Sequence, residues 1–245
     1  MSHHIVEAVN LQYAYPDGTK AIDGITCKII HGESVGIVGA NGAGKSTMLL
    51  LLNGCLTSSS GMVRIGDFPL TDKTLKEVRK RVGTIFQDSD DQLFMPTVYD
   101  DVAFGPLNMG IPIEEVRNRV ETALIMVEAM HLKDRPPYRL SGGQKKAVAI
   151  ATVLSMTPDI LLLDEPSSGL DPKSRRQLIN WLKTFQHTKI IATHDLDLVL
   201  DVCERTIVIS KGKVAADGAT PQIFSNERLL EENHLEKPLC MQNKK

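Results

Sequence analysis

The sequence contains few cysteines, and their spacing excludes two common ways of stabilising a small fold. The chain has four, and no two of them form a C-x-x-C pair: Cys27, Cys55, Cys203 and Cys240. Structural zinc sites and disulfide frameworks both depend on characteristic cysteine spacings. We therefore expect reduced thiols, as in a cytosolic protein, and neither a disulfide scaffold nor a zinc site.

Long apolar runs and an excess of basic residues are also missing. The longest apolar candidate, residues 147–156, is followed by Pro158 and is about half the ~20 residues that a helix needs to cross a bilayer. The N-terminus lacks the basic-then-apolar pattern of a secretory signal. A net charge of −2 without a dense Lys/Arg cluster argues against nucleic acid as the main partner. Work at a membrane would therefore require a partner that docks the chain there.

The chain has the length and composition of one large α/β domain, or of a domain with an inserted subdomain. It has 245 residues, of which 42% are hydrophobic and 24% are charged. Alternating apolar and polar residues at 5–9 and 25–29 predict strands, and Tyr-Pro-Asp-Gly at 15–18 predicts a turn between them. The chain should therefore open with an antiparallel hairpin.

A change of pattern divides the rest of the chain. Strand signals are weak between residues 88 and 156, where apolar residues from Ile113 to Met130 recur at helical spacing. We predict a fold with a phosphate-loop α/β core in residues 1–225 and an inserted helical subdomain at about 88–156. The charged tail at 226–245 should be a loosely docked helix or partly disordered. Further predicted elements are strands at 34–38, 62–65, 82–86, 160–163 and 189–193, helices at 71–82, 171–185 and 220–224, and a hairpin at 206–215.

The most informative stretch is a glycine-rich loop between a β-branched strand and an apolar helix. That context makes the pattern G-x-x-x-x-G-K-[ST] credible as a phosphate-binding loop. Glycines let backbone amides approach a triphosphate, and the helix N-terminus adds unpaired N–H groups. Lys45 would reach the β- and γ-phosphates, and the Ser46 hydroxyl would bind Mg²⁺. The predicted nucleotide-binding residues are Gly39, Ala40, Asn41, Gly42, Ala43, Gly44, Lys45, Ser46 and Thr47.

Two acidic residues end the apolar run at 160–163. In an α/β sheet, ligands bind at the carboxyl edge of the parallel strands. Asp164 therefore suits the shell of a Mg²⁺ ion. Glu165, one residue further on, should point elsewhere and could polarise a water for attack on the γ-phosphate.

A second glycine-containing motif, Leu-Ser-Gly-Gly-Gln at 140–144, precedes a predicted helix at 144–156. A lone Ser-Gly-Gly is consistent with a simple helix N-cap followed by flexible residues. The same sequence also predicts a second bare helix N-terminus with close-approach glycines, and so a second place to hold phosphate.

In this order and spacing, the motifs resemble the ATP-binding cassette of ABC transporters over roughly residues 5–225. Gln87, the segment Ser-Gly-Leu-Asp at 168–171, and His194 complete the likeness. In that family two cassettes close head to tail around ATP, with the phosphate loop from one subunit and the S-G-G-Q signature from the other. The resemblance therefore implies that a second subunit's ATP meets Ser141, Gly142, Gly143 and Gln144.

The resemblance also implies individual roles. Tyr15 resembles the aromatic that stacks on adenine, with Tyr13 as the less favoured candidate and a core tyrosine as the purely structural alternative. Gln87 resembles the glutamine that contacts Mg²⁺ and the attacking water and that links the site to the helical subdomain. Asp171 resembles the acid that crosses the dimer interface. His194 resembles the histidine that contacts the γ-phosphate. Catalysis would then use Lys45, Gln87, Glu165 and His194, with Mg²⁺ bound by Ser46, Gln87 and Asp164.

The segment 86–94 carries a finer resemblance, to ATPases of the energy-coupling-factor importers that take up cobalt, nickel or vitamins. As in those proteins, a second glutamine, Gln92, follows Gln87 by five residues. Two positions depart from the pattern: Ser89 stands where proline is usual, and Ala147 stands where arginine commonly follows the signature. The tail is also short for this group.

These observations predict an ATP hydrolase that binds ATP and Mg²⁺ on the cytoplasmic face of the cell membrane, as a peripheral subunit. It would work as a homodimer, or as a heterodimer with a paralogous ATPase, and would drive integral membrane transporter subunits, with no nucleic acid expected. One alternative is a non-transport cassette ATPase acting on the ribosome or DNA. Another is a module that senses ATP without cleaving it.

Overall fold

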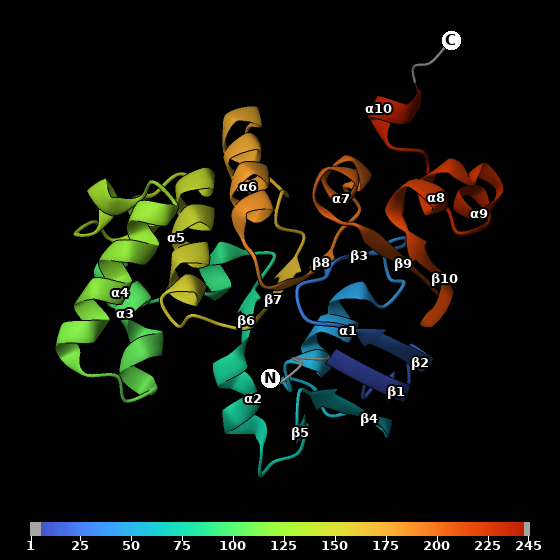
Figure 1. Cartoon of the computed structure of the whole chain (residues 1–245), viewed down its shortest axis with the longest axis horizontal. Helices are drawn as coiled ribbons and strands as arrows, with labels where there is room; N and C mark the ends of the chain where they lie inside the picture. The colour runs from blue at the N-terminus through green and yellow to red at the C-terminus, as the bar shows by residue number, and fades with distance from the viewer. Residues whose placement is uncertain (1–5, 243–245) are drawn as a thin grey trace.

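The computed structural model describes residues 6–242, which form two sheets joined and covered by helices (Figure 1). The predicted first strand begins at Ile5, which lies outside the described residues, as do residues 243–245 of the tail. None of the helices within the described range is long and apolar enough to cross a membrane.

The smaller sheet is antiparallel and opens the chain. The strands β1 (Val6–Ala14) and β2 (Lys20–Ile29) pair as the predicted hairpin and are followed in the sheet by β4 (Ser60–Ile65) and β5 (Phe68–Pro69). The order is β2-β1-β4-β5. Alternate residues of β1 and β2 are buried, as expected of strands that cover a core on one face. The hairpin prediction is confirmed.

The larger sheet has the order β10-β9-β3-β8-β7-β6. Neighbouring strands from β9 to β6 are parallel, and β10 pairs with β9 as the antiparallel hairpin that the sequence predicted. Its strands are β3 (Ser34–Val38), β6 (Val82–Ile85), β7 (Ile160–Asp164), β8 (Thr188–Ala192), β9 (Arg205–Ser210) and β10 (Lys213–Ala219).

Each face of the larger sheet covers its own hydrophobic core. In β7, Ile160 and Leu162 pack into the core shared with the antiparallel sheet and α1 (Lys45–Leu52). Leu161 and Leu163 face the other core, shared with the remaining long helices. All four side chains have no exposed surface. A strand buried on both faces needs a continuous apolar run. For this reason β7 could be predicted from the sequence.

The stretch between β6 and β7 is helical, as the weak strand signal predicted. It contains α3 (Val98–Asn108), α4 (Ile113–Met126) and α5 (Gly142–Leu154). The helix predicted to run to Met130 ends earlier. Glu128 has φ +57°, and the amide of Ala129 donates to the carbonyl of Leu124 at 2.8 Å. This left-handed C-terminal cap ends α4 before the apolar periodicity ends.

Other helices match the predictions less evenly. The helix predicted from Thr71 starts four residues later, as α2 (Leu75–Arg81), while α6 (Pro172–Thr184) begins at its proline as expected. The helix α7 (Leu196–Val202) was not predicted, because its seven residues are too few to show a period.

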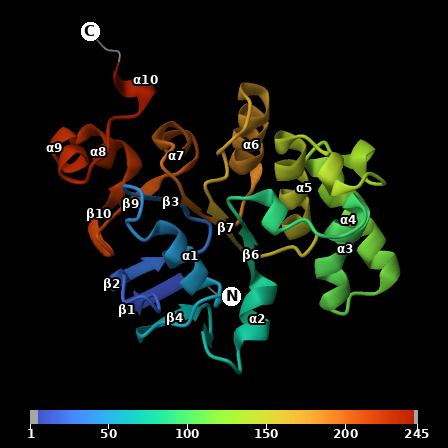
Figure 2. The same cartoon turned by 180° about the vertical axis from the view of Figure 1, so that it is seen from behind.

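The tail is docked. After α8 (Thr220–Ser225), the chain forms α9 (Glu227–Glu232) and α10 (Leu239–Gln242). Leu230 is buried, and the carboxylate of Asp197 in α7 accepts the amides of Leu239 and Cys240 at 3.0 and 3.1 Å. These C-terminal helices and the α3–α5 group lie at opposite ends of the molecule (Figures 1 and 2). Of the two predicted alternatives, the docked helix is the one observed.

Candidate nucleotide-binding site

The glycine-rich loop connects β3 to α1 and is packed tightly against two other strands. A Cβ atom on Gly39 would lie 2.2 Å from the carbonyl oxygen of Ile209 in β9. A Cβ on Gly44 would lie 2.5 Å from the carbonyl oxygen of Ala21 in β2, and Gly44 has φ +109°. Only glycine fits either position without moving backbone. The loop is therefore held rigidly between β9 and β2, in the position that the motif predicted.

The first turn of α1 is suited to an anion. Within the described chain no side chain caps its N-terminus, and its first turn contains no acid. The buried ammonium of Lys45 donates to the carbonyls of Gly39 and Ala40 at 2.9 and 3.3 Å. An ammonium has three N–H donors, so one remains available after these two bonds. Backbone amides and a positive charge therefore converge on one place.

A cleft of about 440 Å³ opens beside this loop. Tyr15 borders it with 37% of its surface exposed, and its hydroxyl lies 2.9 Å from that of Thr47. Tyr13 packs edge-on against Tyr15 and is a partly buried residue that packs against the core. The predicted site residues lining the cleft are Tyr15, Asn41, Gly42, Gly44, Lys45, Ser46, Thr47, Gln87, Glu165 and His194.

Asp164, at the end of β7, has an incompletely satisfied carboxylate next to Ser46. Its Oδ1 atom is buried and finds no hydrogen-bond partner among residues 6–242. Burial raises the pKa of Asp164; the Ser46 hydroxyl and the ammonium groups of Lys45 and Lys146 oppose that rise, whereas Glu165 adds to it. A buried, unpaired carboxylate oxygen beside a hydroxyl is the kind of oxygen donor set that fits Mg²⁺.

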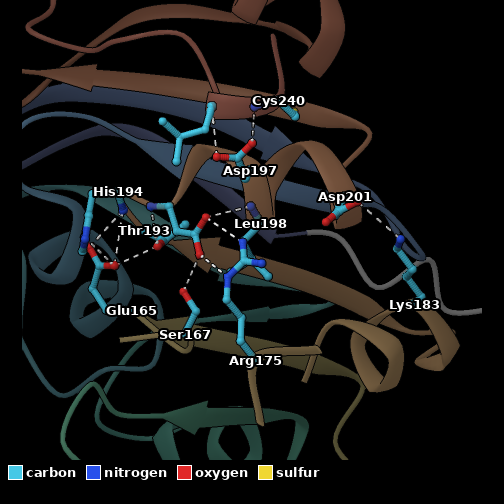
Figure 3. A network of polar contacts seen from close by, with 12 residues as sticks. Glu165, Ser167, Arg175, Lys183, Thr193, His194, Asp197, Leu198, Asp201 and Cys240 are labelled. Atoms are coloured by element: carbon cyan, nitrogen blue, oxygen red, sulfur yellow. Dashed lines mark hydrogen bonds and ion pairs between the residues drawn. The ribbon is translucent and has the colours of Figure 1, made fainter. Parts of the chain in front are cut away.

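Glu165 turns away from Asp164 because its backbone changes conformation at this residue, to φ +42°. Its carboxylate is 7% exposed and accepts hydrogen bonds from the Thr193 hydroxyl at 2.7 Å and the His194 amide at 3.1 Å. The Nδ1 atom of His194 lies 2.9 Å from the same carboxylate (Figure 3). Residues that follow β7 and β8 thus form one acid–imidazole pair, with the imidazole largely exposed toward the cleft.

Asp195 is a structural residue that the sequence reasoning missed. Its carboxylate accepts bonds from Ser167 at 2.9 Å, from Arg175 of α6 at 3.0 Å and from the amide of Leu198 at 2.9 Å. It therefore links the loop after β7 to the loop after β8. An aspartate just before a short apolar helix is an N-cap signal, and that signal could have revealed it.

The Ser-Gly-Gly-Gln motif and Asp171 lie in a second group, outside the lining of the cleft within the described chain. Asp171 caps α6 by accepting the amides of Lys173 and Ser174, and a Cβ on Gly143 would lie 2.4 Å from the Ser174 hydroxyl. The helix that begins with this motif, α5, is the signature helix. It therefore packs closely against α6 at their N-termini.

The prediction of a bare N-terminus for the signature helix is wrong. Ser141 and Gln144 form a reciprocal capping box: the Ser141 hydroxyl accepts the Gln144 amide at 3.4 Å, and the Gln144 side chain accepts the Ser141 amide at 3.0 Å. A serine followed three residues later by glutamine is the sequence signature of this box. The amides of Gly142 and Gly143, at the first two helical positions, remain outside the box.

Comparison with known proteins agrees with this geometry. Residues 22–168 match the model of a family described as ABC transporter. A protein of Geobacter sulfurreducens, provisionally named as an ABC transporter ATP-binding protein, is 64% identical over 99% of this chain and 97% of its own length. The chain therefore belongs to the ABC transporter family, whose ATPase subunits hydrolyse ATP to drive transport. Within that family it is an ATP-binding subunit.

More specific relatives belong to the energy-coupling-factor group. The energy-coupling factor transporter ATP-binding protein EcfA of Carboxydothermus hydrogenoformans is 46% identical over 96% of this chain and 88% of its own length. The structure of CbiO1 from Clostridium perfringens, part of the ABC transporter complex CbiONQ, superposes with a TM-score of 0.82 at 42% identity, covering 94% of each chain. A dimeric bacterial cassette, MJ0796, superposes with a TM-score of 0.79 at 30% identity, covering 88% of this chain and 98% of its own.

Asp195 generates a pH-dependent prediction. Burial alone would raise the pKa of Asp195, but hydrogen bonds from Arg175, Leu198 and Ser167 outweigh it and hold the pKa below its usual value. An acid with a lowered folded-state pKa stabilises the fold above its unfolded pKa, about 3.9, and loses that contribution as pH falls through the folded value. We expect Asp195→Asn to lower the free energy of unfolding at pH 7 by about 1–3 kcal/mol, with the difference shrinking below about pH 4.

Urea denaturation between pH 3 and 7, followed by Trp181 fluorescence, measures this difference. The matched control is Asp72→Asn, an exposed aspartate in the turn before α2, which should behave as wild type at every pH. A deficit of Asp195→Asn that stayed constant down to pH 3 would contradict the electrostatic explanation.

Proposed function

We propose that the chain is the ATP-hydrolysing subunit of an energy-coupling-factor importer that takes up a transition-metal ion, cobalt or nickel, or a vitamin through membrane partners. The observation that carries the ATPase part is the cleft where the phosphate loop meets the Glu165–His194 pair, with the unpaired Asp164 carboxylate oxygen next to Ser46 of its lining. The likeness to EcfA and CbiO1 and the Gln87–Gln92 spacing support the importer type.

The loop binds the triphosphate. Amides at the start of α1 and the ammonium of Lys45 hold the β- and γ-phosphates, and Tyr15 stacks on the adenine from the side of the hairpin. Ser46, Gln87 and Asp164 would hold Mg²⁺, which when bound would supply positive charge to offset the charge developing on the phosphates. The rigid packing of Gly39 and Gly44 keeps these donors in place, so little reorganisation is needed when the charge shifts.

Glu165 orients the attacking water and accepts its proton. Hydrogen bonds from Thr193 and from the His194 amide hold the carboxylate in one rotamer at the lining of the cleft. His194, largely exposed at the cleft rim, donates to a γ-phosphate oxygen. Phosphoryl transfer depends mainly on positioning and on charge stabilisation, and these residues supply both.

The working site requires a second cassette. Ser141 to Gln144 and Asp171 lie away from the cleft in the same chain, so they act on the nucleotide of a partner, either another copy or a paralogue. The solved dimer of MJ0796 supports such an arrangement. ATP bridges the two surfaces when bound, and the helical stretch from about 88 to 156 transmits their closure to the membrane subunits, on the cytoplasmic face.

Glu165→Gln tests the hydrolytic role. The amide keeps the shape of the side chain but cannot accept a proton, so we expect kcat to fall by about 10²–10⁴-fold while ATP affinity stays within a factor of about two. The exposed Glu114→Gln of α4 is the matched control and should retain full turnover. Steady-state phosphate release and equilibrium nucleotide binding measure the two quantities. Wild-type turnover in Glu165→Gln would remove Glu165 from the mechanism.

Dependence on a second cassette predicts that turnover per chain rises with protein concentration. An isolated chain would bind ATP but lack the second subunit's signature, so it should hydrolyse slowly. Phosphate release measured across a dilution series, with the oligomeric state followed by analytical ultracentrifugation, tests this. Turnover per chain that is the same for a clean monomer and a dimer would contradict the two-cassette site.

The proposed importer function predicts specific protein partners. A tagged chain isolated from its own cells should copurify with integral membrane subunits, and mass spectrometry would identify them. Reconstituted in vesicles with those subunits, it should take up Co²⁺, Ni²⁺ or a vitamin only when ATP is hydrolysed. Copurification with ribosomal proteins or DNA instead of membrane subunits would favour the non-transport alternative.

A further inference from the structure

A buried lysine joins the signature helix to the backbone of Gln87. Lys146, in the second turn of α5, is 4% exposed, and its ammonium donates to the carbonyl of Gln87 at 2.8 Å and to that of Phe86 at 3.1 Å. The same helix begins with the signature residues Ser141–Gln144. One side chain therefore spans from the helix that faces the second cassette to the segment that enters this chain's own ATP cleft.

A second side chain ties the same segment to the same helix. The amide of Phe86 donates to the Gln92 side-chain oxygen at 3.3 Å. The Gln92 amide group in turn donates to the Ala149 carbonyl at 2.8 Å and the Thr152 hydroxyl at 2.7 Å. Both polar groups of the Phe86 backbone thus reach α5 through side chains, so displacement of α5 must displace Gln87 as well.

The chemistry of this position requires a side chain with several donors. Two carbonyls converge on Nζ, and an ammonium offers three N–H donors and no acceptor. Burial lowers the pKa of Lys146, while Asp88 and Asp164 oppose that change. Burying an amine is costly, and removing its donors would leave two carbonyls without their partner.

We propose that Lys146 is a positioning residue that makes Gln87 and the signature helix one unit, so that the ATP site of this chain and the signature offered to its partner adjust together. The inference rests on the proposed two-cassette function and deepens it. If the Lys146 contact were broken, Gln87 could take its position in the cleft while α5 was displaced. The two ATP sites would then act independently.

Lys146→Met tests this in the full-length dimer. Methionine keeps the length of the stem and removes every donor. We expect kcat to fall on the order of 10–100-fold, as for a misplaced reacting group, and the Hill coefficient for ATP to fall toward that of independent sites. Nucleotide affinity at a single site should stay within about twofold. Lys146→Gln, which keeps two N–H donors, should restore part of both losses.

Two controls separate positioning from simple loss of fold. Lys76→Met, on the exposed face of α2, should match wild type, and thermal melts should show the fraction of folded protein for every variant. In a Gln87→Ala background, Lys146→Met should lower kcat by a much smaller factor, because the side chain that Lys146 positions is gone. A merely structural lysine would lower the amount of active enzyme equally in both backgrounds and leave the Hill coefficient unchanged.

The outcomes distinguish this inference from the proposed function. If wild type hydrolyses ATP cooperatively and Lys146→Met does so with unchanged kcat and Hill coefficient, the role of Lys146 is overturned and the two-cassette site stands. Additive losses in the Gln87→Ala background overturn it in the same way. A wild type that shows no cooperativity between sites overturns the inference, whereas the two-cassette site is overturned only by turnover per chain that is the same for monomer and dimer.

Discussion

The nucleotide-binding cleft depends on the parallel pairing of four neighbouring strands, β3, β8, β7 and β6. Parallel strands end at the same edge of a sheet, so the loops that follow them meet there. The loop after β3 is the glycine-rich one, β8 is followed by His194, β7 ends in Asp164 and is followed by Glu165, and β6 leads to Gln87. Segments separated by more than a hundred residues thereby become neighbours. Without this strand order the same motifs would not form one site.

The end of β7 shows how one strand supplies two different carboxylates. Asp164 keeps the extended backbone and lies next to Ser46, with its buried Oδ1 atom unpaired among the described residues. Glu165 leaves the strand with a positive φ and is held by Thr193 and His194. A left-handed conformation costs energy in a residue with a Cβ atom, and the three hydrogen bonds offset that strain. The two acids therefore stand in separate environments, although they are adjacent in the chain.

The signature motif lies outside the cleft, and in the proposed function this separation is the reason that the chain needs a partner. Ser141–Gln144 and Asp171 form a rigid, capped pair of helix starts next to each other. Lys146 and Gln92 then connect the first of these helices to the segment that carries Gln87. The structure thus connects the chain's own cleft by polar contacts to the helix whose start, in the proposed function, faces a second cassette.

The sequence by itself determined the phosphate loop, the buried strand β7 with its two acids, the opening hairpin and the family. Each of these is a contiguous pattern, in which local backbone chemistry or continuous burial dictates the residue types. Only the tertiary structure decided where α4 ends, that α7 exists, that the tail is docked on Asp197, and that Asp195 and Lys146 hold distant loops together. Those features depend on contacts between residues far apart in the chain, and a single charged residue carries no local sign of the distant partner that it will meet once the helices pack on the sheet.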